Sequence, residues 1–349
     1  MTTKMRRIVY GGIIAAVAVL LVLGTLFDQT ISNAIYQPEH FVAKLFESVG
    51  IFPPFIFLSA TFVVLFFLVE EEDRRRVWKK ALFAAIAVLP YVVYGFMASE
   101  TFVEKTWVRI LVGVGASAIL TPLTFLVLKG RTREALKRLE VFLVFASIVC
   151  VLSSLLTINV MKYVWGRVRY REMMAAEDYA LQDFTPWYHI NGFSLHGHHS
   201  FPSGHTCSAT NLLVLCALEK VYPDAAKKNV TIRLAVGMYI FLMAYSRIVI
   251  GAHFLSDVTV GFLIGFLCYA AARYVYFDKS KAVMTAIMAI DHEEVSSEET
   301  VAGGDEGTLP VLEREEIEIP RSEETTEDFV LATKVIDAEG ESTGEGKEE

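Results

Sequence analysis

The chain has 349 residues, of which 54% are hydrophobic and only 21% charged, and its mean hydropathy is +0.43. Because a typical soluble domain holds about 45–50% apolar and about 25% charged residues, this composition disfavours an ordinary soluble enzyme and a wholly disordered chain. Residues 291–349 carry 21 acidic and four basic side chains, a net charge of −17, which leaves +9 on residues 1–290 out of the total of −8. The sequence therefore describes a basic, apolar body and an acidic, polar tail.

Apolar stretches long enough to cross a bilayer follow one another along the body. A helix needs about 20 apolar residues to span the hydrocarbon core. Five stretches carry no charge: 8–27, 51–69, 81–99, 110–128 and 141–161. Three more have polar residues at their ends: 206–222, 230–246 and 254–276. We therefore expect an all-α, polytopic membrane helical bundle of about eight transmembrane helices.

Basic side chains before the first span and in every even-numbered connection set the expected orientation. Lysine and arginine accumulate on the cytoplasmic side of membrane proteins. The basic residues are Lys4, Arg6 and Arg7, then Arg74–Arg76, Lys79 and Lys80, then Lys129, Arg131, Arg133, Lys137 and Arg138, then Lys227 and Lys228, and last Lys279 and Lys281. This pattern predicts an integral, multi-pass cell-membrane protein with both termini in the cytoplasm. The first span is long and lacks an obvious cleavage site, which favours an uncleaved anchor.

Two flanking segments are interpreted separately. Residues 28–50 mix apolar and polar side chains and are expected to form an amphipathic helix on the outer surface, over the site entrance. Residues 278–349 are rich in Glu, Ser, Thr and Gly and are expected to be a disordered cytoplasmic tail whose partner the sequence does not identify.

Chemistry-bearing residues cluster in the connections that this orientation places outside. Lys162 and Arg169 are seven residues apart, which would put them on one face if that stretch is helical. His253 and Asp257 are four apart, so the carboxylate can reach and orient the imidazole. The full set is Lys162, Arg169, Ser203, Gly204, His205, Arg247, His253 and Asp257.

This set suits phosphoryl transfer through a histidine nucleophile. Ser203 and Gly204 lie where the sixth span begins, and a helix N-terminus favours an anion. The cations would neutralise charge on the phosphate oxygens in the transition state.

Three motifs carry a resemblance to a known family. Lys-x6-Arg at 162–169, Pro-Ser-Gly-His at 202–205 and Ser-Arg-x5-His-x3-Asp at 246–257 resemble the signatures of the type 2 phosphatidic acid phosphatase superfamily, which includes vanadium haloperoxidases. The first motif departs from the family pattern, since Tyr170 stands where the family has proline. A proline restricts the residue before it, and Arg167 and Arg171 are alternative phosphate ligands.

The resemblance implies a role for each residue. His253 is the nucleophile, Asp257 orients it, and His205 protonates the leaving oxygen and then activates water. The phosphate is held by Lys162, Arg169, Arg247, Ser203 and Gly204. The family uses no metal and no cofactor, and its core is a six-helix bundle.

The resemblance also implies a division of the chain. Residues 1–80 would be an N-terminal membrane hairpin with the outer amphipathic segment, 81–277 the six-span phosphatase core, and 278–349 the tail.

The expected function is hydrolysis of a lipid phosphomonoester or diphosphate at the outer face. Phosphatidic acid, phosphatidylglycerol phosphate and polyprenyl diphosphate are candidate substrates, and no nucleic-acid partner is expected. Two alternatives stay open: phosphotransfer to a sugar or lipid acceptor, and a non-catalytic phospholipid-binding transporter. A vanadate-dependent oxidase is disfavoured by the multi-span body. A histidine-rich stretch at His196, His198 and His199 suggests metal binding, but no carboxylate or cysteine completes a ligand set, and a polar loop is favoured.

Overall fold

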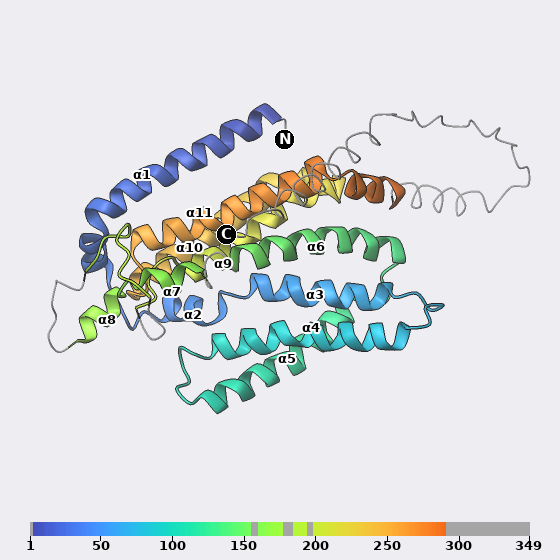
Figure 1. Cartoon of the computed structure of the whole chain (residues 1–349), viewed down its shortest axis with the longest axis horizontal. Helices are drawn as coiled ribbons and strands as arrows, with labels where there is room; N and C mark the ends of the chain where they lie inside the picture. Colours follow the sequence, from blue (N-terminus) through green and yellow to red (C-terminus); the bar gives the residue numbers. More distant parts are fainter. Residues whose placement is uncertain (1–2, 155–159, 177–183, 194–197, 291–349) are drawn as a thin grey trace, which may run out of the picture. The chain divides into compact units, whose positions relative to one another are not determined.

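The computed structural model describes residues 3–154, 160–176, 184–193 and 198–290, and within these ranges all regular structure is helical. The prediction of an all-α fold is confirmed. The helices follow one another along the chain as α1 (Thr3–Ile35), α2 (Phe41–Val49), α3 (Pro53–Leu68), α4 (Arg76–Ala98), α5 (Thr106–Leu128), α6 (Arg133–Ser154), α7 (Lys162–Trp165), α8 (Tyr170–Ala175), α9 (Gly204–Thr210), η3 (Asn211–Lys220), η4 (Pro223–Lys228), α10 (Asn229–Val249), α11 (Leu255–Arg273) and η5 (Tyr274–Lys279). Figure 1 labels the α-helices.

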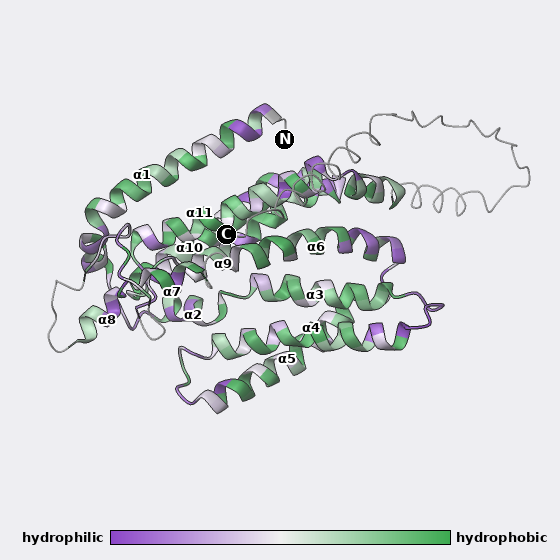
Figure 2. Ribbon diagram, viewed as in Figure 1, coloured by the Kyte–Doolittle hydropathy of each residue, from purple (hydrophilic) through white to green (hydrophobic). Residues whose placement is uncertain are grey.

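Six helical segments in the described part of the chain are long and apolar enough to cross a membrane. They are Lys4–Ile35, Phe41–Leu68, Arg76–Thr101, Thr106–Leu128, Pro223–Val249 and Leu255–Lys279. Figure 2 shows hydrophobic residues along these helices and hydrophilic residues in the connections. The fold is that of a polytopic helical bundle.

The two other expected spans differ from these six for identifiable reasons. The span expected at 141–161 corresponds to α6, whose first turns carry several charged residues and which is followed by residues outside the described ranges. The span expected at 206–222 is divided between the short α-helix α9 and the 3₁₀-helix η3. The number eight stays a prediction.

The sequence suggested one amphipathic helix over residues 28–50, but the structure divides this segment between two helices. α1 continues through Ile35, the chain turns, and α2 begins at Phe41, where the His40 ring accepts a hydrogen bond of 3.3 Å from the Ala43 N–H. No proline or glycine separates the apolar part of α1 from the polar residues that follow it. The helix therefore continues through Asp28 to Ile35. The amphipathic helix is therefore the nine-residue α2 alone.

The chain also stays helical beyond the expected start of the tail. Residues 274–279 form a π-helix and Lys281–Ile290 an α-helix, and Phe277 and Ile290 are buried. The tail prediction is therefore wrong for residues 278–290, and the rest of it lies outside the described residues. The expected boundary at residue 80 stays a prediction.

The bundle has two packing groups that meet at α6. α3, α4 and α5 pack against one another, while α11 packs against α1, α6, α9 and η3. The largest buried cluster joins them and centres on Phe145, Val149 and Cys150 of α6, which contact Val63 of α3 and Tyr269 of α11. α11 also packs directly against α9.

Two glycines allow the unusually close approach of α11 to α9. A Cβ atom on Gly261 would lie 2.4 Å from the Ser203 carbonyl oxygen, and one on Gly265 would lie 2.7 Å from the Thr210 Cβ. Only glycine fits at such distances. The start of α9 and the first turns of α11 are thus held in direct contact.

We expect Gly261→Ala to lower the melting temperature of the detergent-solubilised protein, because the new methyl group must push α11 away from the Ser203 backbone. Overpacking of this kind costs about 1–3 kcal/mol. The matched control is Gly237→Ala on α10, where a Cβ meets nothing within 4 Å. Equal melting temperatures for the two variants would contradict the close-packing argument.

Candidate active site

The turn between α10 and α11 presents His253. Gly251 has a φ of +64°, and a Cβ there would lie 2.7 Å from the Tyr36 ring, so this turn requires glycine. The N–H groups of Ala252 and His253 donate to the Arg247 carbonyl at 3.0 and 3.2 Å. The turn therefore fixes His253 close to the end of α10, with only 2% of the residue exposed.

Hydrogen bonding assigns the tautomer of His253. Its Nδ1 lies 2.5 Å from the Ser200 carbonyl oxygen and 3.9 Å from Asp257 Oδ2. A carbonyl can only accept, so Nδ1 carries the proton and Nε2 has a free lone pair. Burial is the main cause that lowers the pKa of His253, to about 4, so the ring is neutral at pH 7.

Asp257 acts on His253 less directly than its spacing suggested. The expected hydrogen-bond partner of the imidazole was the Asp257 carboxylate, but the oxygen closest to His253 Nδ1 is the Ser200 carbonyl. The Ser200 hydroxyl in turn donates to Asp257 Oδ2 at 2.5 Å. Asp257 Oδ2 also accepts from the Phe254 N–H at 2.9 Å, which caps α11. The carboxylate thus fixes the turn that holds the ring.

His205 lies in the first turn of α9, within the electrostatic influence of His253 and of the neighbouring cations. Burial, followed by the charges of Arg247, His253 and Lys162, lowers the pKa of His205 well below its ordinary value. Its Nε2 lies 3.0 Å from the Glu47 carbonyl oxygen of α2, so Nε2 carries the proton. The two imidazoles, 48 residues apart in sequence, therefore belong to one cluster.

Three cations surround the histidines. Burial, and next the charge of Arg169, lowers the pKa of Lys162 to about 8. Burial, and next the charge of Arg171, also lowers the pKa of Arg169, whose buried Nε has no hydrogen-bond partner in the described part of the chain. Arg247 is fully buried, with Nη1 3.2 Å from Glu47 Oε1. Three cationic side chains whose burial is costly are thus brought together around the two histidines, an arrangement typical of a functional site.

A cavity of about 310 Å³ opens beside these residues. It is lined by Lys44, Glu47, Ile51, Met97, Glu100, Thr101, Arg169, Arg171 and His205. Since Arg169 and His205 face it, the cavity gives a phosphate group access to the cluster.

Ser203 and Gly204 begin α9, as expected. Ser203 is fully buried, and its Oγ accepts from Thr206 N at 3.3 Å and from the Thr206 hydroxyl at 3.0 Å. The Ser203 N–H donates to the Asp257 carbonyl at 3.0 Å. The structure shows Ser203 as the helix cap, and its role in phosphate binding stays a prediction.

The structure separates the three arginines of the first motif. Arg167 is buried in ion pairs with Asp28 at 3.0 Å and Asp257 at 2.5 Å. Arg171 pairs with Glu47 at 2.9 Å. Arg169 has its nearest carboxylate, Glu172, at 3.8 Å. Arg169 is therefore the arginine best placed to bind phosphate.

Tyr170 compensates for the proline that the family has. Arg169 has φ −80° and ψ 147°, the extended backbone that a following proline would impose. The buried Tyr170 ring packs edge-on against Tyr36 and Phe254, and its hydroxyl donates to Asn33 Oδ1 at 2.5 Å. Side-chain anchoring thus maintains the conformation of Arg169.

The histidine-rich stretch is only partly described. His196 lies outside the described residues, His198 Nδ1 lies 3.6 Å from Glu172, and the His199 ring packs against Tyr163. Within the described ranges no group of three or more potential metal ligands gathers. The interpretation as a polar loop stays a prediction.

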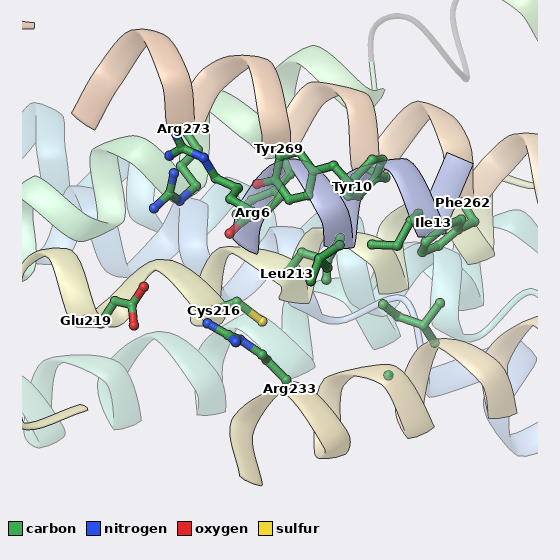
Figure 3. A pocket seen from close by; sticks show the side chains of 14 residues that line it. Arg6, Tyr10, Ile13, Leu213, Cys216, Glu219, Arg233, Phe262, Tyr269 and Arg273 are labelled. Atoms are coloured by element: carbon green, nitrogen blue, oxygen red, sulfur yellow. The ribbon is translucent and has the colours of Figure 1, made fainter. Parts of the chain in front are cut away.

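A second cavity, of about 320 Å³, lies at the other end of α1, α10 and α11 (Figure 3). Its walls are apolar residues such as Ile13, Leu213 and Phe262, and its arginines Arg6 and Arg273 pair with Asp278 at 2.6 and 3.4 Å. Neither His205 nor His253 is among the residues that line this cavity.

Four residues of the site were missed by the sequence reasoning: Asp28, Glu47, Arg167 as a structural ion-pair partner, and Ser200. Asp28 offered a signal, since it is a carboxylate directly after 20 uncharged residues, and a carboxylate at a membrane boundary is costly. Glu47 and the Ser200 carbonyl offered none, because their roles depend on tertiary contacts.

Comparisons with known proteins agree with this geometry. The model of the PAP2 superfamily matches residues 143–281. The chain is 29% identical over 179 residues, covering 49% of this chain and 76% of the relative, to phosphatidylglycerophosphatase B of Bacillus subtilis (strain 168). No solved structure matches the chain. The family match and the similarity to this relative support the resemblance to the type 2 phosphatidic acid phosphatase superfamily that the three motifs carry.

Proposed function

We propose that this protein is a membrane phosphatase that hydrolyses a lipid phosphate ester or diphosphate through a phosphohistidine intermediate. The observation that carries the proposal is the state of His253: its Nδ1–H is bound to the Ser200 carbonyl, so the Nε2 lone pair is available in the midst of cations. Binding phosphate requires cations and amides, whereas an unprotonated, oriented imidazole serves as a nucleophile. A non-catalytic lipid transporter would have no use for it.

The reaction takes place in two steps. His253 Nε2 attacks phosphorus, the bond from phosphorus to the leaving oxygen breaks, and His205 gives that oxygen a proton. Water then attacks the phosphohistidine, His205 takes up a proton from the water, and the P–N bond breaks to release phosphate and neutral His253. The negative charge of bound substrate raises the pKa of His205, because it offsets the cations that lower it in the free enzyme.

The three cations take the part that metal ions play in other phosphatases. Lys162, Arg169 and Arg247 lie around the histidines and neutralise the equatorial phosphate oxygens as charge builds up there. The proposed mechanism accordingly uses no metal.

The position of the site supports a lipid substrate at the outer face. His253 lies in the turn between two helices that are long and apolar enough to span a membrane, Pro223–Val249 and Leu255–Lys279, so we place it at headgroup level. The basic connections lie at the other ends of the helices, where Arg6 meets Asp278 and Arg133 meets Glu70. By the distribution of basic residues we place the termini in the cytoplasm and the site outside. Phosphatidic acid, phosphatidylglycerol phosphate and polyprenyl diphosphate form the substrate panel.

We expect His253→Ala to abolish phosphate release from this panel, because no other group takes over the attack on phosphorus. Rapid quenching with ³²P-labelled substrate should label the wild-type chain and leave the variant unlabelled. The matched control is His189→Ala, an exposed histidine, which should retain activity. Turnover by His253→Ala would refute the mechanism. Transfer of label to an added alcohol instead of water would identify a phosphotransferase.

The pH dependence should reflect Lys162. Since the pKa of Lys162 is lowered to about 8, its positive charge is present below that pH and is lost above it. We expect kcat/KM to fall as pH rises through about 8, because phosphate loses one attractive charge. Lys162→Arg keeps the charge and should move this fall to higher pH. The same alkaline limb in both proteins would rule out Lys162 as its cause.

Cysteine labelling tests the orientation. Tyr188→Cys adds an exposed thiol in the loop next to the site, and Glu72→Cys adds one in the connection between α3 and α4. In intact cells a membrane-impermeant maleimide should label the first and spare the second, and both should react after permeabilisation. The unsubstituted chain gives the background from its own four cysteines. The reverse pattern would place the site in the cytoplasm.

A further inference from the structure

A carboxylate from α1, outside the segment that matches the family, reaches the interior of the site. Asp28 is 2% exposed. Its Oδ2 accepts from Arg167 Nη2 at 3.0 Å and from the Ser256 hydroxyl, and its Oδ1 accepts from the Ser256 N–H at 2.9 Å. One turn earlier, a Cβ on Gly24 would lie 2.9 Å from the Ser256 Cβ. α1 is therefore docked tightly on the first turn of α11 through Gly24 and Asp28.

Arg167 joins this carboxylate to the catalytic one. Its Nη1 donates to Asp257 Oδ1 at 2.5 Å and to Ser256 Oγ at 2.9 Å, while Nε donates to the Thr185 carbonyl at 2.9 Å. The guanidinium also lies over the Phe254 ring, 4.2 Å from its centroid. With these donors used and the side chain fully buried, Arg167 is a link between Asp28 and Asp257 and does not bind phosphate.

The charges of this link sum to −1. If Arg167 paired with Asp257 alone, the pair would be neutral and would give little support to positive charge on the imidazole. Asp28 pairs with the other side of the guanidinium. The positive charge of Arg167 is therefore shared between two carboxylates, and a net negative charge remains near His253. Charges act strongly on one another where water is excluded. The imidazole gains positive charge as it attacks phosphorus, and this negative charge stabilises that change.

We propose that Asp28 is a positioning residue for the reaction, which acts through Arg167 to keep Asp257 oriented and electrostatically available to His253. This inference rests on the proposed function of His253 as the nucleophile. It assigns to α1 a part in the chemistry besides that of a membrane span.

The test is Asp28→Asn, which removes the charge and keeps an oxygen for the Ser256 N–H. We expect kcat to fall about ten- to a hundredfold, the loss that follows when a group that orients a functional histidine is removed. KM and the inhibition constant of inorganic phosphate should change by less than about threefold, because Asp28 does not touch the phosphate. The acidic limb of kcat/KM should move to lower pH, since His253 loses a nearby negative charge while Lys162 and Arg169 remain.

The matched control is Ser32→Ala. Ser32 is one turn further along α1, fully buried, and its Oγ has no hydrogen-bond partner in the described ranges. This variant should have the wild-type rate and pH profile. An unchanged kcat in Asp28→Asn would overturn the inference. So would a loss in which KM, the phosphate inhibition constant and the melting temperature all deteriorate while the pH profile stays fixed, because that pattern marks a purely structural anchor.

A double variant tests the link itself. Arg167→Gln alone leaves Asp28 and Asp257 both negative, whereas Asp28→Asn combined with Arg167→Gln restores the net charge of −1. We expect the double variant to be about tenfold or more faster than Arg167→Gln, because coupled residues are not additive. Additive losses would show that Asp28 does not act through Arg167. Wild-type turnover and its loss in His253→Ala test the proposed function separately, so a failure of the Asp28 inference leaves that function standing.

Discussion

The carboxylate and carbonyl of Asp257 join segments that come from four parts of the chain. The carboxylate binds Arg167 and the Ser200 hydroxyl, and it caps the helix on which Asp257 itself lies. The Asp257 carbonyl accepts the Ser203 N–H, and so connects α11 to the start of α9. Because Ser200 in turn holds the His253 ring, a shift of this one residue would move the nucleophile, the second histidine and the arginine link together.

The electrostatics of the site depend on an unequal distribution of partners. Arg167 is enclosed by two carboxylates, and Arg171 faces Glu47, whereas Lys162 and Arg169 are buried with little compensation. A buried cation without a full counter-charge is unfavourable in the empty protein. Under the proposed function, a bound phosphate supplies the missing counter-charge, so the desolvation cost met during folding is offset when the substrate binds. For Arg247, Glu47 lowers the free-energy cost of burying the positive charge, since its Oε1 lies 3.2 Å from Arg247 Nη1.

The sequence predicted the fold class and the gathering of the motifs because both depend on local patterns. Long uncharged stretches dictate helices in a membrane, and the four-residue spacing of His253 and Asp257 brings the carboxylate within 3.9 Å of the imidazole at the start of α11. The sequence did not predict that the Ser200 carbonyl would take the closest position to His253 Nδ1, nor that Arg167 would pair with both Asp28 and Asp257. Those outcomes depend on which buried donors remain to be satisfied after packing, and no local pattern records that. The helical continuation through Ile290 was missed for a related reason, since the polar residues that suggested a tail are balanced by Phe277 and Ile290 packing inward.

The parts of the chain outside the family match explain how a shared set of motifs can be adapted. The matched segment, residues 143–281, contains both histidines, Asp257 and all three of the cations that we propose bind phosphate. The charges that pair with that set, Asp28 on α1 and Glu47 on α2, come from helices before it. Changes at Asp28 or Glu47 would alter the electrostatic field around His253 and Arg247 without changing a motif residue. If the proposed function holds, these preceding helices offer a way to adjust rate and phosphate affinity while the motifs stay constant.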